Sequence, residues 1–212
     1  MKELERAISA AAEAVVAAAE ELNRLDAQAG DGDLGVTMAL AGRTVLGLLP
    51  TLVERKPHEV LRACGAAIAQ KAPSTAGTPV ATGLLRAGKV LAEAESMSTQ
   101  EAFASALSAA AAGIAERGKA ELGSKTMLDS LGPAAQAAAR AAEAGDSREG
   151  VVTSASVAAE EGARSTAAMR ARHGRAGWLA ERSAGHEDAG ARMVAIVLRS
   201  VAASVAMTEG KV

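Results

Sequence analysis

Aromatic residues are almost absent from this chain: its 212 residues include one Trp, one Phe and no Tyr. Strands favour aromatic and β-branched side chains, so this composition disfavours a sheet. Alanine, the strongest helix former, supplies 55 residues instead. We therefore expect an all-α protein with closely packed helices, organised as one domain over residues 1–212.

Cysteine, net charge and long apolar runs are also scarce. A single cysteine excludes a disulfide within the chain. A net charge of −2 and a pI near 6.0 provide no basic surface for nucleic acid. No apolar run reaches the roughly 18 residues that a membrane span requires, and the acidic start of the chain is unlike a secretory signal. These absences predict a cytoplasmic protein that binds neither nucleic acid nor membrane.

Three carboxylates lie within the segment LDAQAGDGDLG, residues 25–35. Asp26, Asp31 and Asp33 are separated by glycines that interrupt a regular helix, so three like charges share one tight turn. Such charges repel, and an unpaired buried carboxylate is costly. A hard divalent cation with oxygen ligands, Mg²⁺ or Ca²⁺, would relieve the repulsion.

The spacing distinguishes between these two cations. A calcium-binding EF-hand loop counted from Asp31 needs Glu at its twelfth position, which is Gly42 here. Magnesium instead prefers one or more carboxylates together with phosphate oxygens, so a Mg-nucleotide site is the sharper hypothesis. The alternative is a solvated acidic turn that caps a helix beginning near Leu34, and the residues alone leave it open.

Hydrophobic periodicity predicts eight helices and no strand of any strength. They cover roughly residues 4–22, 35–49, 60–68, 80–91, 103–117, 126–144, 147–169 and 193–205. Short links favour antiparallel neighbours, so alternate loops should lie at the same end. We name these the odd loops: loop one (26–35), loop three (73–79), loop five (118–125) and loop seven (170–188).

The odd loops carry residues that suit a nucleotide. In loop three, two hydroxyls and a glycine precede a helix whose N–H groups could bind phosphate, although an ordinary capped turn by itself is the favoured explanation of the pattern. In loop five, Gly118 and Met127 could border an adenine, or Met127 could simply be core. Lys125 would face phosphate or solvent.

Loop seven offers two further candidates. Arg175 could make charge-assisted hydrogen bonds to phosphate. Asp188 is placed to cap the last helix and could also contact a ribose. His186 is more simply a hydrogen-bonding support than a metal ligand.

Three segments of the sequence resemble the L subunit of dihydroxyacetone kinases and the equivalent nucleotide-binding domain of single-chain kinases. They are LDAQAGDGDLGVTM, SKTMLDSLGPA and HGRAGWLAERSAGHEDAGA, which occur in the family's order across nearly the whole chain. The family fold is an eight-helix antiparallel up-and-down barrel with the nucleotide and two Mg²⁺ ions at one end. The resemblance implies that closed barrel here.

The resemblance also implies roles for individual residues. The aspartates Asp26, Asp31 and Asp33 would hold the metal and, with Arg175, form the catalytic set. The nucleotide contacts would be Leu34, Gly35, Val36, Thr37, Thr75, Ala76, Gly118, Met127, Arg175, Asp188, Ala189 and Gly190. The chain departs from the family pattern at several positions. Family members often have His at Leu34 and Ser at Ala76, and the pattern has Gly-Ala-Leu at residues 77–79, Asp at Ser124 and Pro at Ala189.

By resemblance, the chain is a phosphotransferase subunit that holds Mg-ATP or Mg-ADP for a keto-sugar bound on a separate K subunit. Either ATP turns over, or bound ADP is rephosphorylated by a phosphotransferase-system partner. A regulatory module that senses Mg-ADP and docks without chemistry is the rival hypothesis, motivated by Leu34 and Ala76. A purely structural bundle leaves the four unusual loops unexplained.

Overall fold

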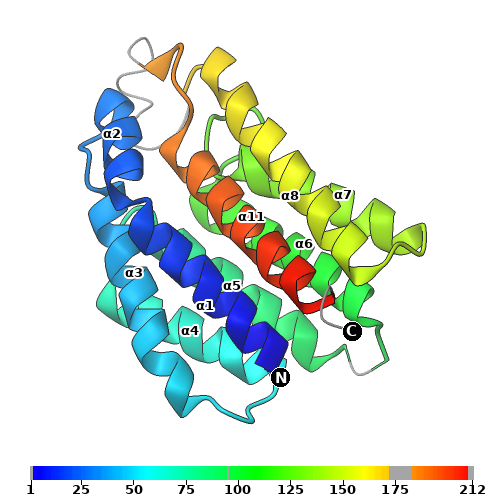
Figure 1. Cartoon of the computed structure of the whole chain (residues 1–212). Helices are drawn as coiled ribbons and strands as arrows, with labels where there is room; N and C mark the ends of the chain where they lie inside the picture. Colours follow the sequence, from blue (N-terminus) through cyan, green and yellow to red (C-terminus); the bar gives the residue numbers. More distant parts are fainter. Residues whose placement is uncertain (1, 95, 172–182, 210–212) are drawn as a thin grey trace.

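The computed structural model describes residues 2–94, 96–171 and 183–209 (Figure 1). Within these residues there are nine α-helices and no strand, which confirms the all-α prediction. The helices are α1 (Lys2–Ala17), α2 (Ala19–Ala29), α3 (Leu34–Leu48), α4 (Pro57–Lys71), α5 (Gly77–Ala92), α6 (Thr99–Gly118), α7 (Leu128–Glu143), α8 (Arg148–Ser165) and α11 (Ala189–Glu209). Short 3₁₀ turns, Leu49–Thr51 and Thr166–Ala168, follow α3 and α8.

The helices close into a barrel. From α3 to α8 each helix packs against the next along the chain, α8 packs against α11, and α11 packs against α1, which contacts α3 (Figure 1). The first and last helices therefore complete the ring, with α1 and α2 together forming one of its eight members. The predicted antiparallel barrel is confirmed.

The periodicity predicts one continuous first helix, but in the structure that helix is divided at Ala18. That residue has φ −85° and ψ 5°, outside the helical range. Backbone bonds still cross the break, from Ala18 N–H to the carbonyl of Ala14 and from Leu22 N–H to that of Ala18, both 3.0 Å. The helix is therefore bent, and α2 packs against α3. Alanine is such a good helix former that the sequence gives no sign of this bend.

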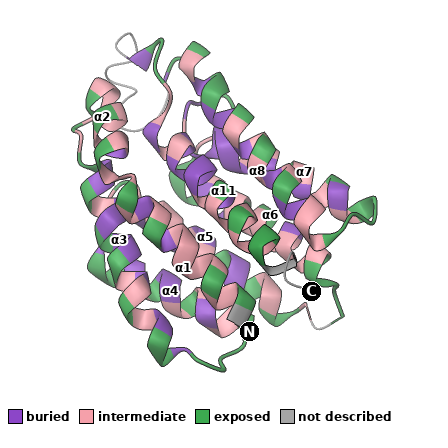
Figure 2. Cartoon of the chain, viewed as in Figure 1, coloured by how far each residue is buried: buried purple, intermediate pink, exposed green. Residues whose placement is uncertain are grey.

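Small side chains build much of the core. Ala134 and Ala138 of α7 and Ala155 and Ala159 of α8 are fully buried, and these two helices pack against each other. A Cβ on Gly162 would lie 2.3 Å from the backbone oxygen of Asp129, so the two backbones nearly touch. Figure 2 shows exposed and buried positions alternating around the helices, as amphipathic members of a barrel require.

Two helical stretches, Leu34–Thr51 and Ala189–Met207, are long and apolar enough to cross a membrane by length and composition alone. The expectation that no apolar run reaches that length is therefore wrong. In the barrel, α3 packs against α1, α2 and α4, and α11 packs against α1, α7 and α8.

The topology brings the described residues of the odd loops to one end of the barrel, which we call the rim. In Figure 1 the end of α2 and the residues before α11 lie at the top, whereas the N-terminal end of α1 lies at the bottom. The chain descends through α3 and returns through α4, so residues 72–76 are at the rim as well. The opposite end carries the turns around residues 52–56, 93–98 and 144–147.

Candidate functional site

The three aspartates of loop one converge at the rim. Asp26 lies in the last turn of α2, and Asp31 and Asp33 lie in the turn that leads into α3. One carboxylate oxygen from each lies within 4.8 Å of the others. Asp31 and Asp33 are exposed and Asp26 is partly buried, so the cluster opens to solvent. The three aspartates, which are close in the sequence, thus form a compact set of oxygen donors in the structure.

Asp26 also caps the start of α3. Its Oδ2 accepts hydrogen bonds from the N–H groups of Asp33 at 3.0 Å and Leu34 at 3.3 Å. The Asp33 side chain makes no such bond, although Asp33 is the residue at the N-cap position. The capping hypothesis therefore applies to Asp26, and capping does not account for Asp33.

Glycines leave the space in which the carboxylates approach. A Cβ on Gly30 would lie 2.5 Å from Oδ1 of Asp26, and Gly32 has φ +75°, a left-handed conformation that side chains disfavour. A Cβ on Gly35 would lie 1.9 Å from the carbonyl oxygen of Ala19, so only glycine lets α3 approach α2 this closely. Converging carboxylates with room beside them fit the donor set of a hard divalent cation.

The first turn of α3 is bound to α2 by a second side chain. Oδ1 of Asn23 accepts from the N–H of Val36 at 3.1 Å, a contact that sequence reasoning missed. Leu34 is buried in the core cluster, so only its backbone is directed toward the aspartates. Val36 is exposed and Thr37 is partly buried at the rim. The side chain of Leu34 thus contributes packing.

Loop three has the geometry of a capped turn. The Ser74 hydroxyl accepts from the N–H groups of Ala76 at 3.2 Å and Gly77 at 2.8 Å, at the start of α5. Thr75 is exposed and Ala76 is partly buried. Backbone N–H groups considered for phosphate are thus engaged by Ser74, a residue that the sequence hypothesis did not single out.

Lys125 of loop five neither faces phosphate nor is solvated, so both readings of it are wrong. Its side chain is buried, and its Nζ donates to the carbonyl oxygens of Met169, Ser183 and His186 at 3.2, 2.5 and 2.7 Å. Burial lowers the pKa of Lys125, and the Asp188 carboxylate opposes that shift. The three carbonyls compensate for the lost hydration of the ammonium group.

Asp129, another buried residue, organises loop five. Its Oδ1 accepts from the N–H of Gly123 and its Oδ2 from the N–H of Thr126 at 2.7 Å. These bonds fix the turn that precedes Met127, which is itself buried at the start of α7. Gly118, at the other end of the loop, is exposed.

Asp188 caps the last helix, as the sequence predicts. Its Oδ1 accepts from the N–H of Ala191 at 2.7 Å, and its own N–H donates to the buried Thr166 hydroxyl at 2.8 Å. Desolvation raises the pKa of Asp188 to about 7, with the charges of Asp129 and Asp26 acting in the same direction. The carboxyl group therefore lies close to both the aspartate cluster and loop five.

The start of α11 meets loop five. A Cβ on Gly190 would lie 3.3 Å from Cβ of Met127 and 3.1 Å from Oδ1 of Asp188. Ala189, beside it, is buried. Met127 and residues 188–190 are thus brought together, as the hypothesis of a shared nucleotide contact requires. Arg175 lies outside the described residues.

Three residues of the rim escaped sequence reasoning: Asn23, Ser74 and Thr166. Each is a short polar side chain that bonds a backbone N–H of another segment or of the next turn. Such residues are common in turns and helices generally, so nothing in their local sequence marks them. Asp129 and Lys125 carried a signal, because both lie in the segment SKTMLD, but their partners are distant in sequence.

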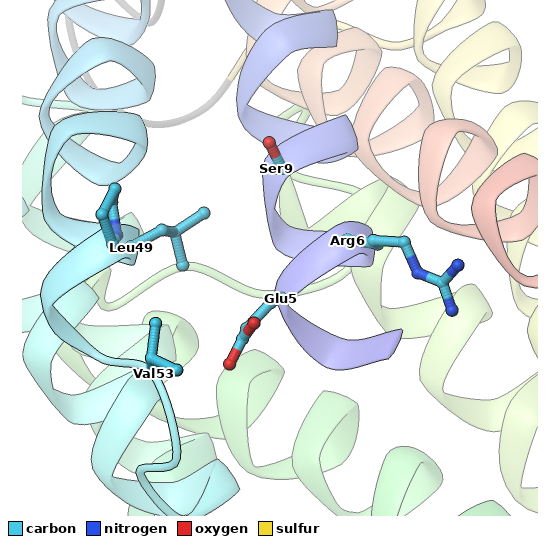
Figure 3. Close-up of a pocket in the computed structure, with 6 residues that line it drawn as sticks. Glu5, Arg6, Ser9, Leu49 and Val53 are labelled. Carbon is cyan, nitrogen blue, oxygen red and sulfur yellow. The ribbon is translucent and has the colours of Figure 1, made fainter. Parts of the chain in front are cut away.

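A surface hollow also exists at the opposite end of the barrel (Figure 3). Leu49 and Val53 lie across it from Glu5, while the Arg6 side chain points away from them. The hollow lies between the beginning of α1 and the end of α3. The aspartate cluster lies at the other end of the barrel, beside the beginning of α3. It does not contain the donor set of the rim.

Comparison with known proteins agrees with this geometry. The model of the DAK2 domain family matches residues 28–203. The ADP-binding subunit DhaL of the PEP-dependent dihydroxyacetone kinase of Escherichia coli is 32% identical over 183 residues, covering 86% of this chain and 87% of that protein. The D-erythrulose kinase of Mycolicibacterium smegmatis is 35% identical over 209 residues, covering 97% of this chain but 36% of that protein.

The fold is shared with a solved structure. The dihydroxyacetone kinase of C. freundii in its native form superimposes with a TM-score of 0.76 at 24% identity, covering 96% of this chain and 34% of that one. This chain thus spans about a third of the longer kinases that it matches and most of the DhaL subunit. A family model that matches most of the barrel, together with these relatives, establishes that the chain belongs to the DAK2-domain family.

Proposed function

We propose that this chain is the nucleotide-binding part of a cytoplasmic keto-sugar kinase. Residues 1–212 would act as one domain that holds Mg-ATP or Mg-ADP at the rim and presents a phosphoryl group to a ketose on a K-type partner subunit. The observation that carries the proposal is the convergence of Asp26, Asp31 and Asp33 within 4.8 Å at the start of α3. A structural bundle has no need for three carboxylates that converge on one point beside the start of a helix.

The relatives support this proposal. The E. coli protein that shares 32% identity is an ADP-binding subunit of a dihydroxyacetone kinase. The C. freundii dihydroxyacetone kinase in complex with AMP-PNP and Mg²⁺ has the same fold, with a TM-score of 0.75 at 24% identity. Other relatives are erythrulose kinases and triokinases, so the acceptor would be a small keto-sugar.

The aspartates would hold Mg²⁺ and would not act as nucleophiles, because phosphoryl transfer chiefly needs positioning and charge neutralisation. Bound Mg²⁺, proposed as two ions, supplies neutralisation of the phosphate oxygens. The start of α3, with its positive dipole end, would favour the phosphates beside Gly35 and Thr37. Met127 and residues 188–190 would contact the base and ribose, and Arg175 the phosphates.

Two modes of action fit this arrangement. In one, ATP binds, transfers its terminal phosphoryl group and leaves as ADP. In the other, ADP stays bound and is rephosphorylated by a phosphotransferase-system protein, in line with the PEP-dependent name of the E. coli relative. Product formed per bound nucleotide, measured with a K-type partner and a ketose, distinguishes turnover of ATP from a relay on bound ADP.

The proposal is tested with Asp31→Asn. Asp146→Asn is the matched control, because Asp146 is an exposed aspartate in a turn at the opposite end of the barrel. Calorimetry should show Mg²⁺-dependent ADP binding for the wild type and D146N and its loss for D31N, with ketose phosphorylation lost in parallel. Partner docking and Mg-ADP binding without any transfer would instead identify the regulatory module.

A further inference from the structure

The buried polar side chains in the described part of the chain gather around loops five and seven. They are Ser124, Lys125, Asp129, Ser130, Thr166 and Ser183. Buried polar groups destabilise a fold unless they are satisfied, so a cluster of them in one place specifies a geometry. Lys125 is the longest of these side chains, and its backbone has φ +60°, a left-handed conformation unusual for lysine.

Lys125 joins three segments that are distant in sequence. Its ammonium group has three N–H donors, and the carbonyls of Met169, Ser183 and His186 accept from it. In the sequence, Met169 precedes residues 172–182 and Ser183 follows them. The Ser183 hydroxyl accepts from the N–H of Ala171 at 3.2 Å and so joins the same two segments. Lys125 therefore holds together the residues that precede and follow positions 172–182.

The same contacts fix the distance between the two parts of the proposed nucleoside site, which are Met127 and residues 188–190. Lys125 is two residues before Met127, and His186 is two residues before Asp188. Asp188 is held further by the Thr166 hydroxyl, and Gly190 approaches Met127 closely enough that an added Cβ would be 3.3 Å away. A displacement of the His186 carbonyl from Lys125 would therefore move Asp188 and Gly190 relative to Met127.

We propose that Lys125 is a positioning residue for the nucleoside part of the ligand: its ammonium group holds Met127 and Asp188–Gly190 at the spacing that accepts the base and ribose. This inference rests on the proposed function, since it concerns the same nucleotide. The aspartate cluster is held by different contacts, through Asp26 and Asn23. The nucleoside part of the site and the metal-binding aspartates are thus supported separately, and a probe that lacks the nucleoside distinguishes them.

The test compares Mg-ADP with Mg-pyrophosphate by calorimetry on the full chain. Lys125→Met should weaken Mg-ADP binding by about tenfold or more, because the site loses its preorganisation. Mg-pyrophosphate, which lacks the nucleoside, should lose much less affinity than Mg-ADP, because the aspartates that would hold its metal ion do not depend on this lysine, and of its proposed contacts only Arg175 lies in loop seven. Lys89→Met, at an exposed lysine of α5, is the matched control and should change neither affinity.

Arginine should not rescue the loss. Its planar guanidinium fork is built for carboxylates and phosphates and cannot direct three N–H groups at three converging carbonyls. Lys125→Arg should therefore resemble Lys125→Met in losing Mg-ADP selectively. A folded Lys125→Met variant with wild-type affinity for Mg-ADP, or with equal losses for Mg-ADP and Mg-pyrophosphate, overturns the inference. Failure of the wild type to bind either probe would instead overturn the proposed function.

A milder variant keeps the inference testable if Lys125→Met does not fold. Ser183→Ala removes the hydroxyl that accepts from Ala171 and leaves the lysine in place. It should weaken Mg-ADP by about threefold with no change for Mg-pyrophosphate, and amide exchange over residues 183–190 should accelerate. Faster exchange there with Mg-ADP affinity unchanged would contradict the role of the contact between Ala171 and Ser183 in positioning the nucleoside.

Discussion

The two ends of the barrel are held together in different ways. At the end opposite the rim, serines cap helices one turn away, as Ser98 accepts from Glu101 N–H at 3.3 Å. The bonds there between distant segments come from exposed side chains, such as that of Gln100 to the carbonyl of Asp146 at 3.5 Å. At the rim the bonds run between segments far apart in sequence, from Lys125 to Met169, Ser183 and His186. The described contacts of the far turns are thus local or exposed, whereas at the rim a buried side chain joins distant segments.

The difference indicates where substitutions should affect ligand binding. A local cap stabilises its own helix, so its loss should lower stability and leave the rim unchanged. A buried polar group at the rim fixes several segments at once, so its loss should alter the site as well as the stability. The following variants test this distinction, from the largest expected effect to the smallest.

Gly35→Ala should give the largest loss of stability. Its Cβ would lie 1.9 Å from the carbonyl oxygen of Ala19, so α2 and α3 must separate, at a cost of about 3 kcal/mol. The same separation would displace Asp26 from the start of α3. Urea unfolding measures the stability, and calorimetry with Mg-ADP measures the effect on binding.

Gly47→Ala is the control for this variant, on the far end of the same helix. Nothing lies within 4 Å of a Cβ built there, so alanine should stabilise the protein by about 0.5–1 kcal/mol through its helix propensity. Mg-ADP binding should not change. Equal stabilities for the two alanine variants would show that the contact between α2 and α3 is unimportant.

Mg²⁺ and ADP together should protect the rim selectively. Binding to the folded state alone stabilises a protein by about 2.7 kcal/mol at a ligand concentration one hundred times the Kd. Relief of repulsion among the aspartates should concentrate the protection in residues 26–35, while the turn at residues 144–147 should exchange as before. Hydrogen exchange with and without ligand measures this, and equal exchange over residues 26–35 would argue against a ligand there.

Asp188 should make stability depend on pH. An acid whose pKa is raised on folding, here from 3.8 to about 7, binds its proton more tightly in the folded state. Its stabilising contribution is therefore complete below about pH 4 and is lost as the pH rises through about 7. Asp188→Asn removes the titration and keeps an oxygen acceptor for Ala191.

The Asp188→Asn variant should therefore gain stability relative to the wild type progressively as the pH rises from about 4 to about 8. Urea unfolding at a series of pH values, without Mg²⁺ or nucleotide, measures the difference. Asp146→Asn, at the opposite end, is the control. A stability difference between D188N and wild type that stays constant with pH would contradict the raised pKa.

Ser98→Ala should have the smallest effect. Loss of the capping bond to Glu101 should lower stability by about 1 kcal/mol, and Mg-ADP affinity should stay the same. Ser74→Ala removes a comparable cap at the rim, where the N–H groups of Ala76 and Gly77 would be released. A change in Mg-ADP affinity for S74A but not S98A would extend the distinction between the two ends to loop three.

Much of the fold follows from the sequence, because helix propensity and apolar spacing are local properties. The alanine content and periodicity predict the helices and, with short links, their antiparallel order. The bend at Ala18 was missed, since it depends on the packing of α2 against α3 and on the space left by Gly35. Closure of the ring came from family resemblance and is confirmed by the contact between α1 and α11.

The site could be predicted where its residues are close in sequence and not where they are distant. Asp26, Asp31 and Asp33 share one turn, so their spacing alone indicated convergence. Lys125 was misread because its three partners lie 44 to 61 residues away and are backbone carbonyls, which leave no mark in a sequence. Asn23 and Thr166 were missed for the same physical reason.

The most direct test of the central claim is the anomalous scattering from a crystal of this chain soaked with Mn²⁺ and ADP, with Mn²⁺ standing in for Mg²⁺. We predict an anomalous peak among the carboxylates of Asp26, Asp31 and Asp33, with the ADP phosphates beside it. A rim without an anomalous peak, with the three side chains directed into solvent while ADP binds elsewhere, would contradict the claim.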